Sequence, residues 1–355
     1  MNKSEQTVFV GLSGGVDSSV AALRLKNQGY KVVGVFIKVW HPDFMECNWE
    51  QERLDAMRVA AHLDIPFLTC DAEKEYRDEV AHFFIEEYKV GRTPNPDVMC
   101  NQHVKFGAFL EFAKAKGADY IATGHYAQRI DTDTGAQLHR GLDTNKDQTY
   151  FLWTLSDEQL QRSLFPVGDT PKEGIRNEAL QAGVPTATKK DSQGICFLGH
   201  VDIPDFLSHY IELTPGDVLN EAGEVIGTHA GALVYTNGQR HGFTLHTKDA
   251  QREPVFVVAR DIDKNTITVG NKASLVCDST HIILESIVLR KAVTAGDTVE
   301  LQFRYRQTPL QATVESISDN QIQLRLLEET EQPAVGQSCV LYVGSLCLGG
   351  GIISS

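Results

Sequence analysis

One short stretch constrains the fold of this 355-residue chain more than any other. It lies between an apolar, β-branched run at residues 7–12 and a run of helical composition at residues 20–25, and it reads Ser13-Gly14-Gly15-Val16-Asp17-Ser18. The flanking runs predict a buried strand followed by a helix. In a strand-to-helix turn, unpaired backbone N–H groups and the positive end of the helix dipole point at one place. The stretch therefore favours binding of a phosphate group.

This turn differs from both common nucleotide-binding motifs. It lacks the lysine of G-x-x-x-x-G-K-[ST] and the glycine spacing of G-x-G-x-x-G. Its two glycines have no Cβ, so backbone can approach an anion closely, and Ser13, Ser18 and Ser19 add hydroxyl donors. A solvent-facing glycine turn is the alternative interpretation. The order of the six residues between a strand and a helix favours nucleotide binding.

The first part of the chain alternates strand and helix patterns. We expect strands at residues 7–12, 31–40, 65–71 and 119–126, and helices at 50–63, 73–89 and 105–116. This alternation predicts an α/β fold with a doubly wound parallel sheet. Ligands bind such sheets beyond the carboxyl ends of the strands. That edge would carry the glycine turn, Gly124 and His125, and Ile37, which would line an adenine pocket.

The pattern changes near residue 210. Short strand-like runs follow, broken by Gly, Asn and Asp, at residues 255–259, 266–269, 281–289, 298–305, 312–316, 321–327 and 338–343. Their spacing predicts small β domains. We therefore predict a catalytic α/β domain over residues 1–207, a small central β-rich domain over 208–275 and a C-terminal β-barrel over 276–355.

Residues 91–101 join two of the predicted helices and contain Pro94 and Pro96. Two prolines one residue apart oppose regular structure and stiffen the chain. We expect a rigid loop that presents Asn95, Asp97 and Cys100. A simple linker is an equally supported alternative.

Composition narrows the possible classes of protein. The seven cysteines are odd in number and include no C-x-x-C pair, which argues against a disulfide framework and a zinc or iron–sulfur site, so we predict no dedicated metal site. The net charge of −14 disfavours a polyanionic partner, although a local basic patch would still bind nucleic acid. No apolar run is long enough for a membrane span, and residues 1–6 lack signal or transit features. We expect a cytoplasmic protein without a membrane partner.

The glycine turn resembles the signature of the PP-loop ATP pyrophosphatases, which cleave ATP to AMP and pyrophosphate. Further motifs in the same order resemble the bacterial tRNA-specific 2-thiouridylase family over nearly the whole chain. These motifs are Asn95-Pro96-Asp97-Val98-Met99-Cys100-Asn101, Thr123-Gly124-His125-Tyr126, Lys146-Asp147-Gln148, Asp191-Ser192-Gln193-Gly194-Ile195-Cys196-Phe197 and Arg304-Tyr305-Arg306.

The resemblance implies a reaction and a nucleotide site. ATP would adenylate the C2 oxygen of the tRNA wobble uridine, because a carbonyl oxygen leaves poorly and an AMP ester leaves well. A magnesium ion accompanying ATP is chemically expected. The residues that would hold ATP are Gly11, Leu12, Ser13, Gly14, Gly15, Val16, Asp17, Ser18, Ile37 and Gly124.

The resemblance also implies how sulfur enters. Cys196 would carry a persulfide whose sulfur comes from a donor protein. Cys100 would attack the persulfide and leave a Cys100–Cys196 disulfide, or else assist release of sulfide. Asp97 would act as a general acid or base. The other cysteines match no family motif and are expected to be buried and inert.

A partner tRNA follows from the same resemblance. A wobble base lies in a single-stranded loop and can be flipped into a pocket, where Asn95, Pro96 and Asp97 would contact it. Other positions that would contact tRNA are His125, Lys146, Asp147, Gln148, Arg304, Tyr305 and Gln337. A lone histidine is more often structural, and a bare Arg-x-Arg is more often a solvated strand face.

Two other functions compete with tRNA thiolation. A PP-loop ligase or amide synthetase for a small molecule would need the ATP site, but would have no use for Cys196 or the β domains. A non-catalytic tRNA-binding protein would have no reason to keep an intact Ser-Gly-Gly-Val-Asp-Ser turn.

Overall fold

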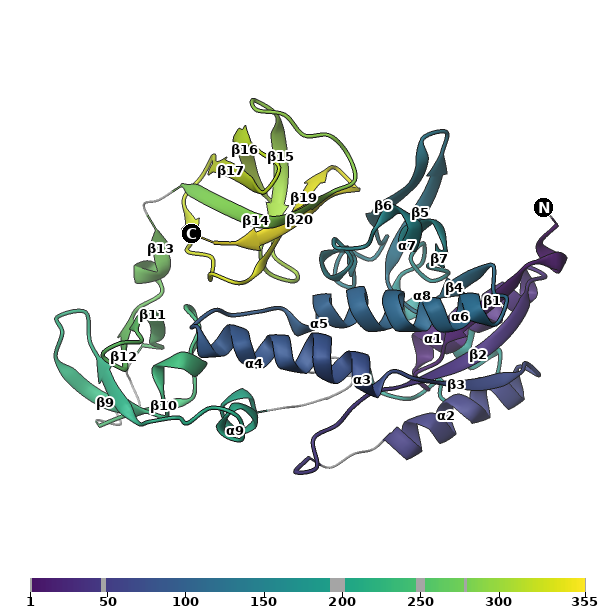
Figure 1. The fold of residues 1–355 in the computed structure, drawn as a ribbon, viewed down its shortest axis with the longest axis horizontal. Coiled ribbons are helices and arrows are strands. Elements are labelled where there is room, and N and C mark those ends of the chain that lie inside the picture. Colours follow the sequence, from purple (N-terminus) through teal and green to yellow (C-terminus); the bar gives the residue numbers. More distant parts are fainter. Residues whose placement is uncertain (1, 46–48, 192–201, 247–252, 278–279, 355) are drawn as a thin grey trace.

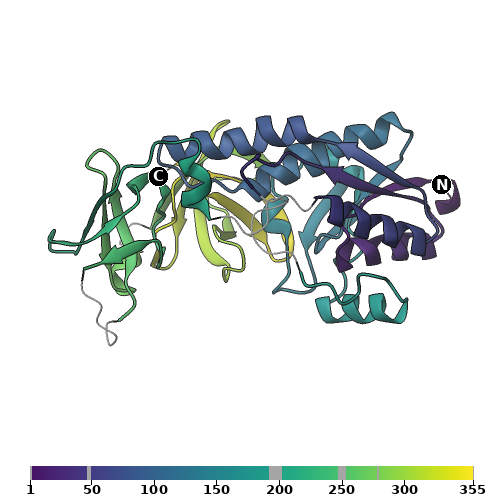
Figure 2. The same cartoon turned by 90° about the horizontal axis from the view of Figure 1, so that it is seen from below.

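The computed structural model describes residues 2–45, 49–191, 202–246, 253–277 and 280–354. Figure 1 shows a parallel sheet with its helices at one end of the molecule, a group of central strands at the other end, and a barrel beside both. Figure 2 shows the helices of residues 73–115 along one side, reaching from the central strands to the parallel sheet.

The parallel sheet confirms the predicted doubly wound α/β fold. Its strand order is β3-β2-β1-β4-β7, and all neighbours are parallel. The direction of the connections reverses between β1 and β4, and sheets of this type bind ligands beyond the carboxyl ends of the strands at such a point. The strands are β1 (Thr7–Gly11), β2 (Lys31–Lys38), β3 (Phe67–Asp71), β4 (Tyr120–Ala122) and β7 (Ser163–Leu164).

Both faces of this sheet are covered because its strands are apolar on both sides. In β1, Val8 and Val10 belong to one buried cluster and Phe9 to another, as the alternation of side chains along a strand requires. The first cluster packs under α1 (Val16–Asn27), α2 (Trp49–His62) and α8 (Lys172–Gln181). The second packs under the helix that ends in α6 (Phe109–Ala115).

That helix corrects the prediction of a loop over residues 91–101. α5 (Pro96–Met99), the π-helical segment η3 (Cys100–Ala108) and α6 run on without a break, so the second half of the predicted loop is helical. Pro96 is the first helical residue, where a missing N–H costs nothing. Asn95 before it is extended, with φ −106° and ψ 91°, as a residue before proline prefers. The proline marks the start of a helix.

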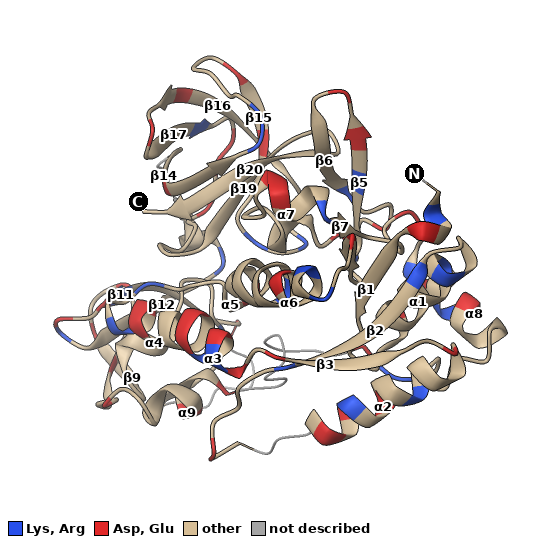
Figure 3. Ribbon diagram, turned by 45° about the vertical axis from the view of Figure 1, so that its right-hand side comes forward, with Lys and Arg blue, Asp and Glu red and all other residues tan. Residues whose placement is uncertain are grey.

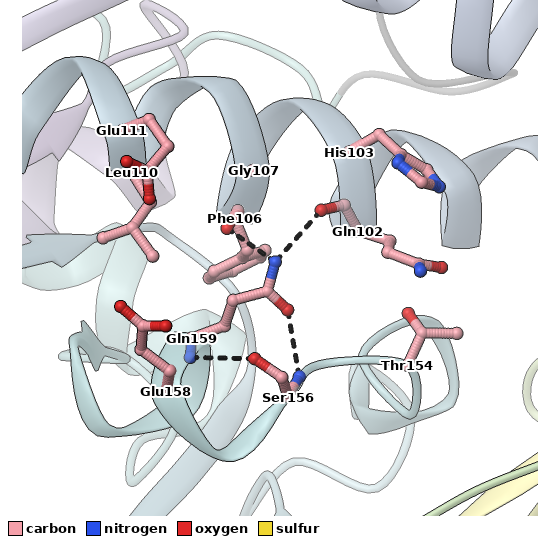
Figure 4. A pocket seen from close by; sticks show the side chains of 10 residues that line it. All are labelled: Gln102, His103, Phe106, Gly107, Leu110, Glu111, Thr154, Ser156, Glu158 and Gln159. Atoms are coloured by element: carbon pink, nitrogen blue, oxygen red, sulfur yellow. Dashed lines mark hydrogen bonds between the residues drawn. The ribbon is translucent and has the colours of Figure 1, made fainter.

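A glutamine from α7 (Asp157–Gln161) fastens the π-helical segment, as Figure 4 shows. The Nε2 of Gln159 donates to the carbonyl oxygens of Phe106 (2.8 Å) and Gln102 (3.3 Å). Its own backbone N–H donates to Ser156 Oγ at 3.2 Å, which caps α7. The pocket in this figure, about 410 Å³, lies between the two helices.

The C-terminal strands form the predicted β-barrel. Their order is β14-β17-β16-β15-β19-β20, and β14 pairs again with β20, which closes the barrel. The strands are β14 (His281–Leu289), β15 (Thr298–Gln302), β16 (Leu310–Ile317), β17 (Gln321–Leu326), β19 (Ser338–Val343) and β20 (Leu346–Ile353).

A hairpin that the sequence reasoning missed joins this barrel to the α/β part. It consists of β5 (Ala127–Thr132) and β6 (Gly135–Arg140), and β6 pairs with β20 at His139 and Leu346. Because β6 follows β4 in the chain, the barrel is hydrogen-bonded to a segment that leaves the ligand edge of the parallel sheet.

The central strands form a third sheet, in the order β10-β9-β8-β12-β11. Its apolar side packs against Phe84, Ile85 and Tyr88 of α4. Its strands are β8 (Gly216–Leu219), β9 (Val225–His229), β10 (Phe243–Leu245), β11 (Phe256–Asp261) and β12 (Thr266–Gly270). The remaining elements are η1 (Lys3–Glu5), α3 (Glu73–Glu75), η2 (Tyr76–Ala81), α4 (His82–Lys89), η4 (Thr149–Phe151), α9 (Ile203–Ser208), η5 (Ala232–Val234), η6 (Ala273–Leu275), β13 (Val276–Cys277) and β18 (Thr330–Glu331).

Candidate functional site

The glycine turn has a shape that other residues would not allow. Gly14 has φ +68°, and a Cβ there would lie 2.7 Å from Asp55 Cβ and 3.0 Å from the carbonyl oxygen of Glu52 in α2. Gly15 precedes α1 in an extended conformation and provides no side-chain cap. The first N–H groups of α1 therefore keep their capacity to bind an anion. Binding of a phosphate group by this turn stays a prediction.

Serine hydroxyls hold the turn in place. Ser18 Oγ accepts the backbone N–H of Ser13 at 3.3 Å and lies 3.3 Å from both Ser13 Oγ and the carbonyl oxygen of Gly15. Ser19 Oγ donates to the same Gly15 oxygen at 2.7 Å. Ser18 and Ser19 are buried, whereas Ser13 is exposed. Ser13 is the hydroxyl of the three that solvent or a ligand reaches most easily.

The structure brings Gly124, Gly11 and Ile37 to the same edge. A Cβ on Gly124 would lie 2.7 Å from the backbone nitrogen of Ser18 and 2.8 Å from the carbonyl carbon of Asp17, so β4 ends directly against the first turn of α1. Ile37 Cδ1 lies 3.6 Å from the position of a Cβ on Gly11, and Ile37 is only 6% exposed. The role of Ile37 in an adenine pocket stays a prediction.

An ion-pair network borders the turn. Both carboxylate oxygens of Asp17 accept from Lys172 Nζ, at 2.7 and 2.8 Å, and one also accepts from the Tyr126 hydroxyl at 2.7 Å. Lys172 Nζ also lies 2.8 Å from Asp191, which pairs with Lys146 at 2.7 Å. We call the set of Asp17, Lys172, Asp191, Lys146 and Arg176 the ion-pair network, since Arg176 lies 3.0 Å from Asp191.

The network sets the charge state of its members. Burial raises the pKa of Asp191, but hydrogen bonds from Lys146 and Lys172 outweigh burial and lower this pKa to about 2. Burial and the Asp17 carboxylate raise the pKa of Tyr126 far above its usual value, so the phenol stays protonated and donates. Figure 3 shows Lys and Arg as well as Asp and Glu along the ribbon, so the net charge of −14 is an average over many residues of both signs.

Sequence reasoning missed the two residues that hold Asp17. Tyr126 was visible as the residue after Gly124 and His125 in a quoted motif. Lys172 carried no local signal, because it stands 155 positions from Asp17 and no motif includes it.

His125 lies in the core. It is 7% exposed, its Nδ1 is 2.7 Å from Thr123 Oγ1, and its ring packs near Phe106 and Phe165. Burial, with a smaller contribution from Lys105, lowers its pKa well below 6.5, so the ring is neutral at pH 7. These contacts are structural, and a contact with tRNA stays a prediction.

The Lys146-Asp147-Gln148 segment is fixed by its own side chains. Asp147 accepts from the backbone N–H of Gly141 at 3.0 Å and from Arg140 at 3.0 Å. Gln148 Oε1 accepts the N–H of Tyr126 at 3.0 Å, and its own N–H donates to the carbonyl oxygen of Tyr126 at 2.9 Å. The segment is thereby tied to the residue that holds Asp17.

The predicted tRNA residues of the barrel lie beside this segment. Arg304 forms an ion pair with Glu331, and Tyr305 packs against Phe151 with ring centroids 4.8 Å apart. Arg306 stacks over Tyr305 at 5.0 Å and donates to the carbonyl oxygen of Asn145 at 2.9 Å. Two groups of residues that are far apart in the sequence thus become neighbours.

Asn95 and Gln337 also come together. Asn95 Oδ1 accepts the N–H of Ser338, the residue after Gln337, at 2.7 Å. The Tyr150 hydroxyl bonds to the carbonyl oxygens of Phe303 and Ser338, both at 3.1 Å. The side-chain oxygen of Gln337 is buried, and among the described residues it has no hydrogen-bond partner.

The cysteines fall into separate groups. Cys100 begins η3 and is completely buried, and Asp97 lies one turn earlier in the same helix. Cys196 lies outside the described residues, as does Cys47. Cys70, Cys339 and Cys347 are buried thiols outside any disulfide, which confirms that part of the prediction. Burial raises the pKa of Cys70 to about 12, which disfavours the reactive thiolate.

Within the described residues, the helices are too short or too polar to cross a membrane.

The fold and the glycine turn define a nucleotide-binding α/β domain followed by β-rich regions. Three family models match the chain in agreement with this division. Residues 6–200 match a model described as the tRNA methyl transferase HUP domain, and residues 204–271 match one described as the tRNA methyl transferase PRC-barrel domain. Residues 279–353 match one described as the aminomethyltransferase β-barrel domain.

Curated relatives define the family more closely. A protein of Klebsiella pneumoniae named tRNA-specific 2-thiouridylase MnmA is 45% identical over 365 residues, which cover 99% of this chain and 98% of the relative. One of Listeria welshimeri with the same name is 45% identical over 361 residues, covering 100% and 96%. The chain belongs to the tRNA-specific 2-thiouridylase (MnmA) family, whose members are tRNA sulfurtransferases.

Solved structures are more distant. A 4-thiouridine synthetase in complex with RNA and ATP matches with a TM-score of 0.36 and 18% identity, covering 58% of this chain and 50% of that one.

Proposed function

We propose that this chain uses ATP to convert the wobble uridine of tRNA to 2-thiouridine, with release of AMP and pyrophosphate. One observation carries the proposal: the glycine turn is connected through Asp17, Lys172 and Asp191 to Lys146. Lys146 belongs to the segment that borders residues 304–306 of the barrel. If the turn binds phosphate and residues 304–306 bind RNA, ATP and an RNA loop would be held close together, as a reaction between ATP and a tRNA base requires.

In the first step, the C2 oxygen of uridine attacks the α-phosphate of ATP, pyrophosphate leaves, and the base becomes an AMP ester. We propose that residues 11–18 hold ATP together with Ile37 and Gly124. A magnesium ion would accompany the phosphates.

In the second step, sulfur replaces the activated oxygen. The terminal sulfur of a persulfide on Cys196 attacks C2 and AMP leaves, so that the base is joined to Cys196 through two sulfur atoms. The Cys100 thiolate then attacks the Cys196 sulfur, and the bond between the two sulfur atoms breaks. 2-Thiouridine and a Cys100–Cys196 disulfide result, and a thiol reductant must restore both cysteines. A donor protein supplies the next sulfur.

The buried position of Cys100 adds a requirement. Cys100 is completely buried and belongs to a core cluster of the α/β part, so its thiol must become accessible before it can attack. We infer that binding of the tRNA base at Asn95-Pro96-Asp97 moves the first turns of this helix. Asp97 would then serve as the acid or base next to the flipped uridine.

We also propose a function for each of the predicted domains. Residues 1–207 would perform catalysis, 208–275 would form a separate small domain, and 276–355 would bind tRNA through Arg304, Tyr305 and Gln337. A cytoplasmic location remains a prediction from the sequence.

Turnover of radiolabelled ATP with unmodified tRNA tests the function. We expect AMP release that depends on tRNA, with 2-thiouridine formed when a persulfide donor is present. A tRNA with cytidine at the wobble position is the matched control and should release no AMP. AMP release without tRNA would favour a small-molecule ligase, and tRNA binding without any turnover would favour a non-catalytic binding protein.

A further inference from the structure

The helix that carries Cys100 has π spacing just after this residue. At the end of η3, the backbone N–H of Phe109 donates to the carbonyl oxygen of Val104, five residues earlier. A π turn contains more residues than an α turn, and such turns are frequent at functional sites. Successive residues lie about 100° apart around an α-helix and rise about 1.5 Å. Taking one residue out of the π turn would therefore rotate and shift the part of the helix before it, where Asp97 and Cys100 lie.

Gln159 of α7 holds this π turn from outside. Its Nε2 donates to the carbonyl oxygens of Phe106 at 2.8 Å and Gln102 at 3.3 Å, which both lie inside η3 (Figure 4). A side chain that bonds to the backbone of a helix in this way supports a departure from regular spacing. Gly107 belongs to the same arrangement, because a Cβ there would lie only 3.0 Å from the carbonyl oxygen of Gln102.

The cap of α7 does not by itself require a glutamine at position 159. The Oε1 of Gln159 accepts the N–H of Ser156 at 2.9 Å, and Ser156 Oγ accepts the N–H of Gln159 at 3.2 Å. Glutamate forms this reciprocal cap as well as glutamine does. An ionised glutamate has no donor for the two carbonyl oxygens of η3, whereas the amide of glutamine provides both an acceptor and a donor. Gln159 is thus suited to cap α7 and hold η3 at once.

The observed helix register leaves a polar group beside Cys100 unsatisfied. Asn101 is only 2% exposed, and its Nδ2 donates to the carbonyl oxygen of Phe151 at 3.0 Å. Its Oδ1 is buried and has no hydrogen-bond partner within the described part of the chain. An unpaired buried acceptor is costly, so a rotated register could relieve this cost. The pocket of about 410 Å³ beside η3 leaves space for such a movement.

We propose that Gln159 is a positioning residue that keeps η3 in its π form and thereby keeps the Cys100 thiol buried until tRNA binds. When its two bonds to η3 break, the turn loses a residue and the start of the helix rotates out of the core. Gln159 is in this way a latch on the second proposed catalytic thiol.

The inference deepens the proposed function and rests on it for the purpose of the latch. An accessible Cys100 thiolate would attack the Cys196 sulfur of the persulfide before any base is activated. The bond between the two sulfur atoms of the persulfide would break, a Cys100–Cys196 disulfide would form, and hydrosulfide would leave. The sulfur would then be lost before it reaches the uridine.

The competing explanation is that Gln159 only joins α7 to the neighbouring helix. Two matched variants separate these explanations. Gln159→Glu keeps the acceptor that caps α7 and removes the donor to η3. Ser156→Ala removes one bond of the cap and leaves the donor. Gln159→Met, which is neutral and of similar size, removes both functions of the amide.

The rate of alkylation of Cys100 tests the latch. The full-length wild type and the three variants are treated with iodoacetamide without tRNA, and peptide mass spectrometry follows each cysteine. We expect both Gln159 variants to raise the rate at Cys100 about tenfold, because the loss of two hydrogen bonds favours the open form. Cys70 lies in the same buried cluster and Cys339 in the barrel, and neither rate should change. Ser156→Ala should leave the ratio of the Cys100 rate to the Cys70 rate unchanged.

Each other result has a defined meaning. An unchanged Cys100-to-Cys70 ratio in a folded Gln159 variant overturns the inference. An equal rise at both cysteines also overturns it, since the whole core is then loosened. So does a rise of the ratio in Ser156→Ala equal to that in Gln159→Glu, because docking of α7 would then suffice. Circular dichroism checks the fold, and each Gln159 variant replaces the other if one does not fold.

The same readout separates the latch from the proposed function. Alkylation of Cys100 needs neither ATP nor tRNA. If the Cys100-to-Cys70 ratio rises in the Gln159 variants but the wild type releases no AMP with tRNA, the positioning role stands and the proposed function fails. If AMP release depends on tRNA but the ratio is unchanged, the proposed function stands and the latch fails.

Discussion

Asn95 Oδ1 accepts the backbone N–H of Ser338 at 2.7 Å, across 243 positions of sequence. This bond joins the start of the helix that carries Asp97 and Cys100 to strand β19 of the barrel. The proposed base-contacting residues and the proposed tRNA-binding barrel are thus held in a fixed relation before any RNA binds.

The first prediction tests this bond. Asn95→Ala leaves the N–H of the buried residue Ser338 without its acceptor, which should lower the free energy of unfolding by about 1–3 kcal/mol. Asn95→Asp keeps an acceptor and should lose much less. Urea unfolding of both variants measures the difference. Equal stability of Asn95→Ala and wild type would show that the bond does not hold the barrel.

The second prediction concerns Arg304, which is paired with Glu331. If Arg304 contacts a tRNA phosphate, Glu331 competes with the RNA for it. Glu331→Gln should then tighten tRNA binding several-fold, and Arg304→Ala should make the dependence of log affinity on log salt shallower by roughly one unit. Binding titrations over a range of salt concentrations measure both effects.

A matched control removes the effect of overall charge. Glu315 pairs with Arg325 at 3.3 Å on the same barrel, and Glu315→Gln changes the net charge as Glu331→Gln does. It should leave tRNA affinity nearly unchanged. If both variants tighten binding equally, long-range charge and not the release of Arg304 is responsible.

The third prediction follows from the pKa of Asp191, which is lowered from 3.8 to about 2. A carboxylate with a lowered pKa stabilises the fold above its unfolded pKa, and this contribution is lost as pH falls toward the folded pKa. Asp191→Asn should therefore reduce the free energy of unfolding at pH 7 by about 1–2 kcal/mol, allowing for partial exposure. The difference from wild type should shrink as pH falls from about 4 toward 2.

Urea unfolding at a series of pH values, down to the lowest at which the protein still unfolds cooperatively, checks this. Asp261→Asn is the control, because Asp261 pairs with Lys264 on the exposed surface and should matter little at any pH. A difference for Asp191→Asn that stays constant with pH would contradict the assigned charge state.

The fourth prediction separates the two proposed catalytic thiols. After exposure to a sulfur donor, wild type and Cys100→Ser should gain about 32 Da on Cys196, and Cys196→Ser should gain nothing at this site. Cys196→Ser should form no 2-thiouridine but still bind ATP and tRNA. Cys100→Ser should accept sulfur on Cys196 but fail to complete the later transfer or turnover. Intact-protein mass spectrometry reads the adduct. An adduct on Cys100 would invert the roles, and full activity of either variant would remove the two-cysteine mechanism.

The sequence predicts those parts of the fold that rest on local patterns. Runs such as residues 7–12 and 281–289 are apolar and β-branched, and both are strands. The β5–β6 hairpin was missed because its side chains are mostly polar and only partly buried. Strand β20 was missed because three successive glycines, which disfavour a strand, lie within it. There they are needed: a Cβ on Gly350 would lie 2.4 Å from the carbonyl oxygen of Cys339.

The same distinction between local patterns and long-range contacts applies to the candidate site. The glycine turn is contiguous, so the order of residues 13–18 and the patterns on either side of them were enough to predict a strand-to-helix turn. The partners of Asp17 could not, because Lys172 reaches it only after the sheet and α8 have formed. The prediction of a loop over residues 91–101 was wrong for another reason. Proline breaks a helix from within but is favoured at its first position, and the local sequence does not distinguish these two cases.

The pairing of β6 with β20 affects how this protein can be recombined with its relatives. Val340, Tyr342 and Cys347 of the barrel share a buried cluster with Trp153 and Tyr150 of the α/β part. A chimera cut in the linker before β14 would leave Tyr150 and Trp153, and the free edge of β6, facing a foreign surface. Exchanging barrels between relatives therefore requires that the β5–β6 hairpin and residues 149–155 be transferred together with the barrel. The unit that can be exchanged is then not one continuous stretch of sequence.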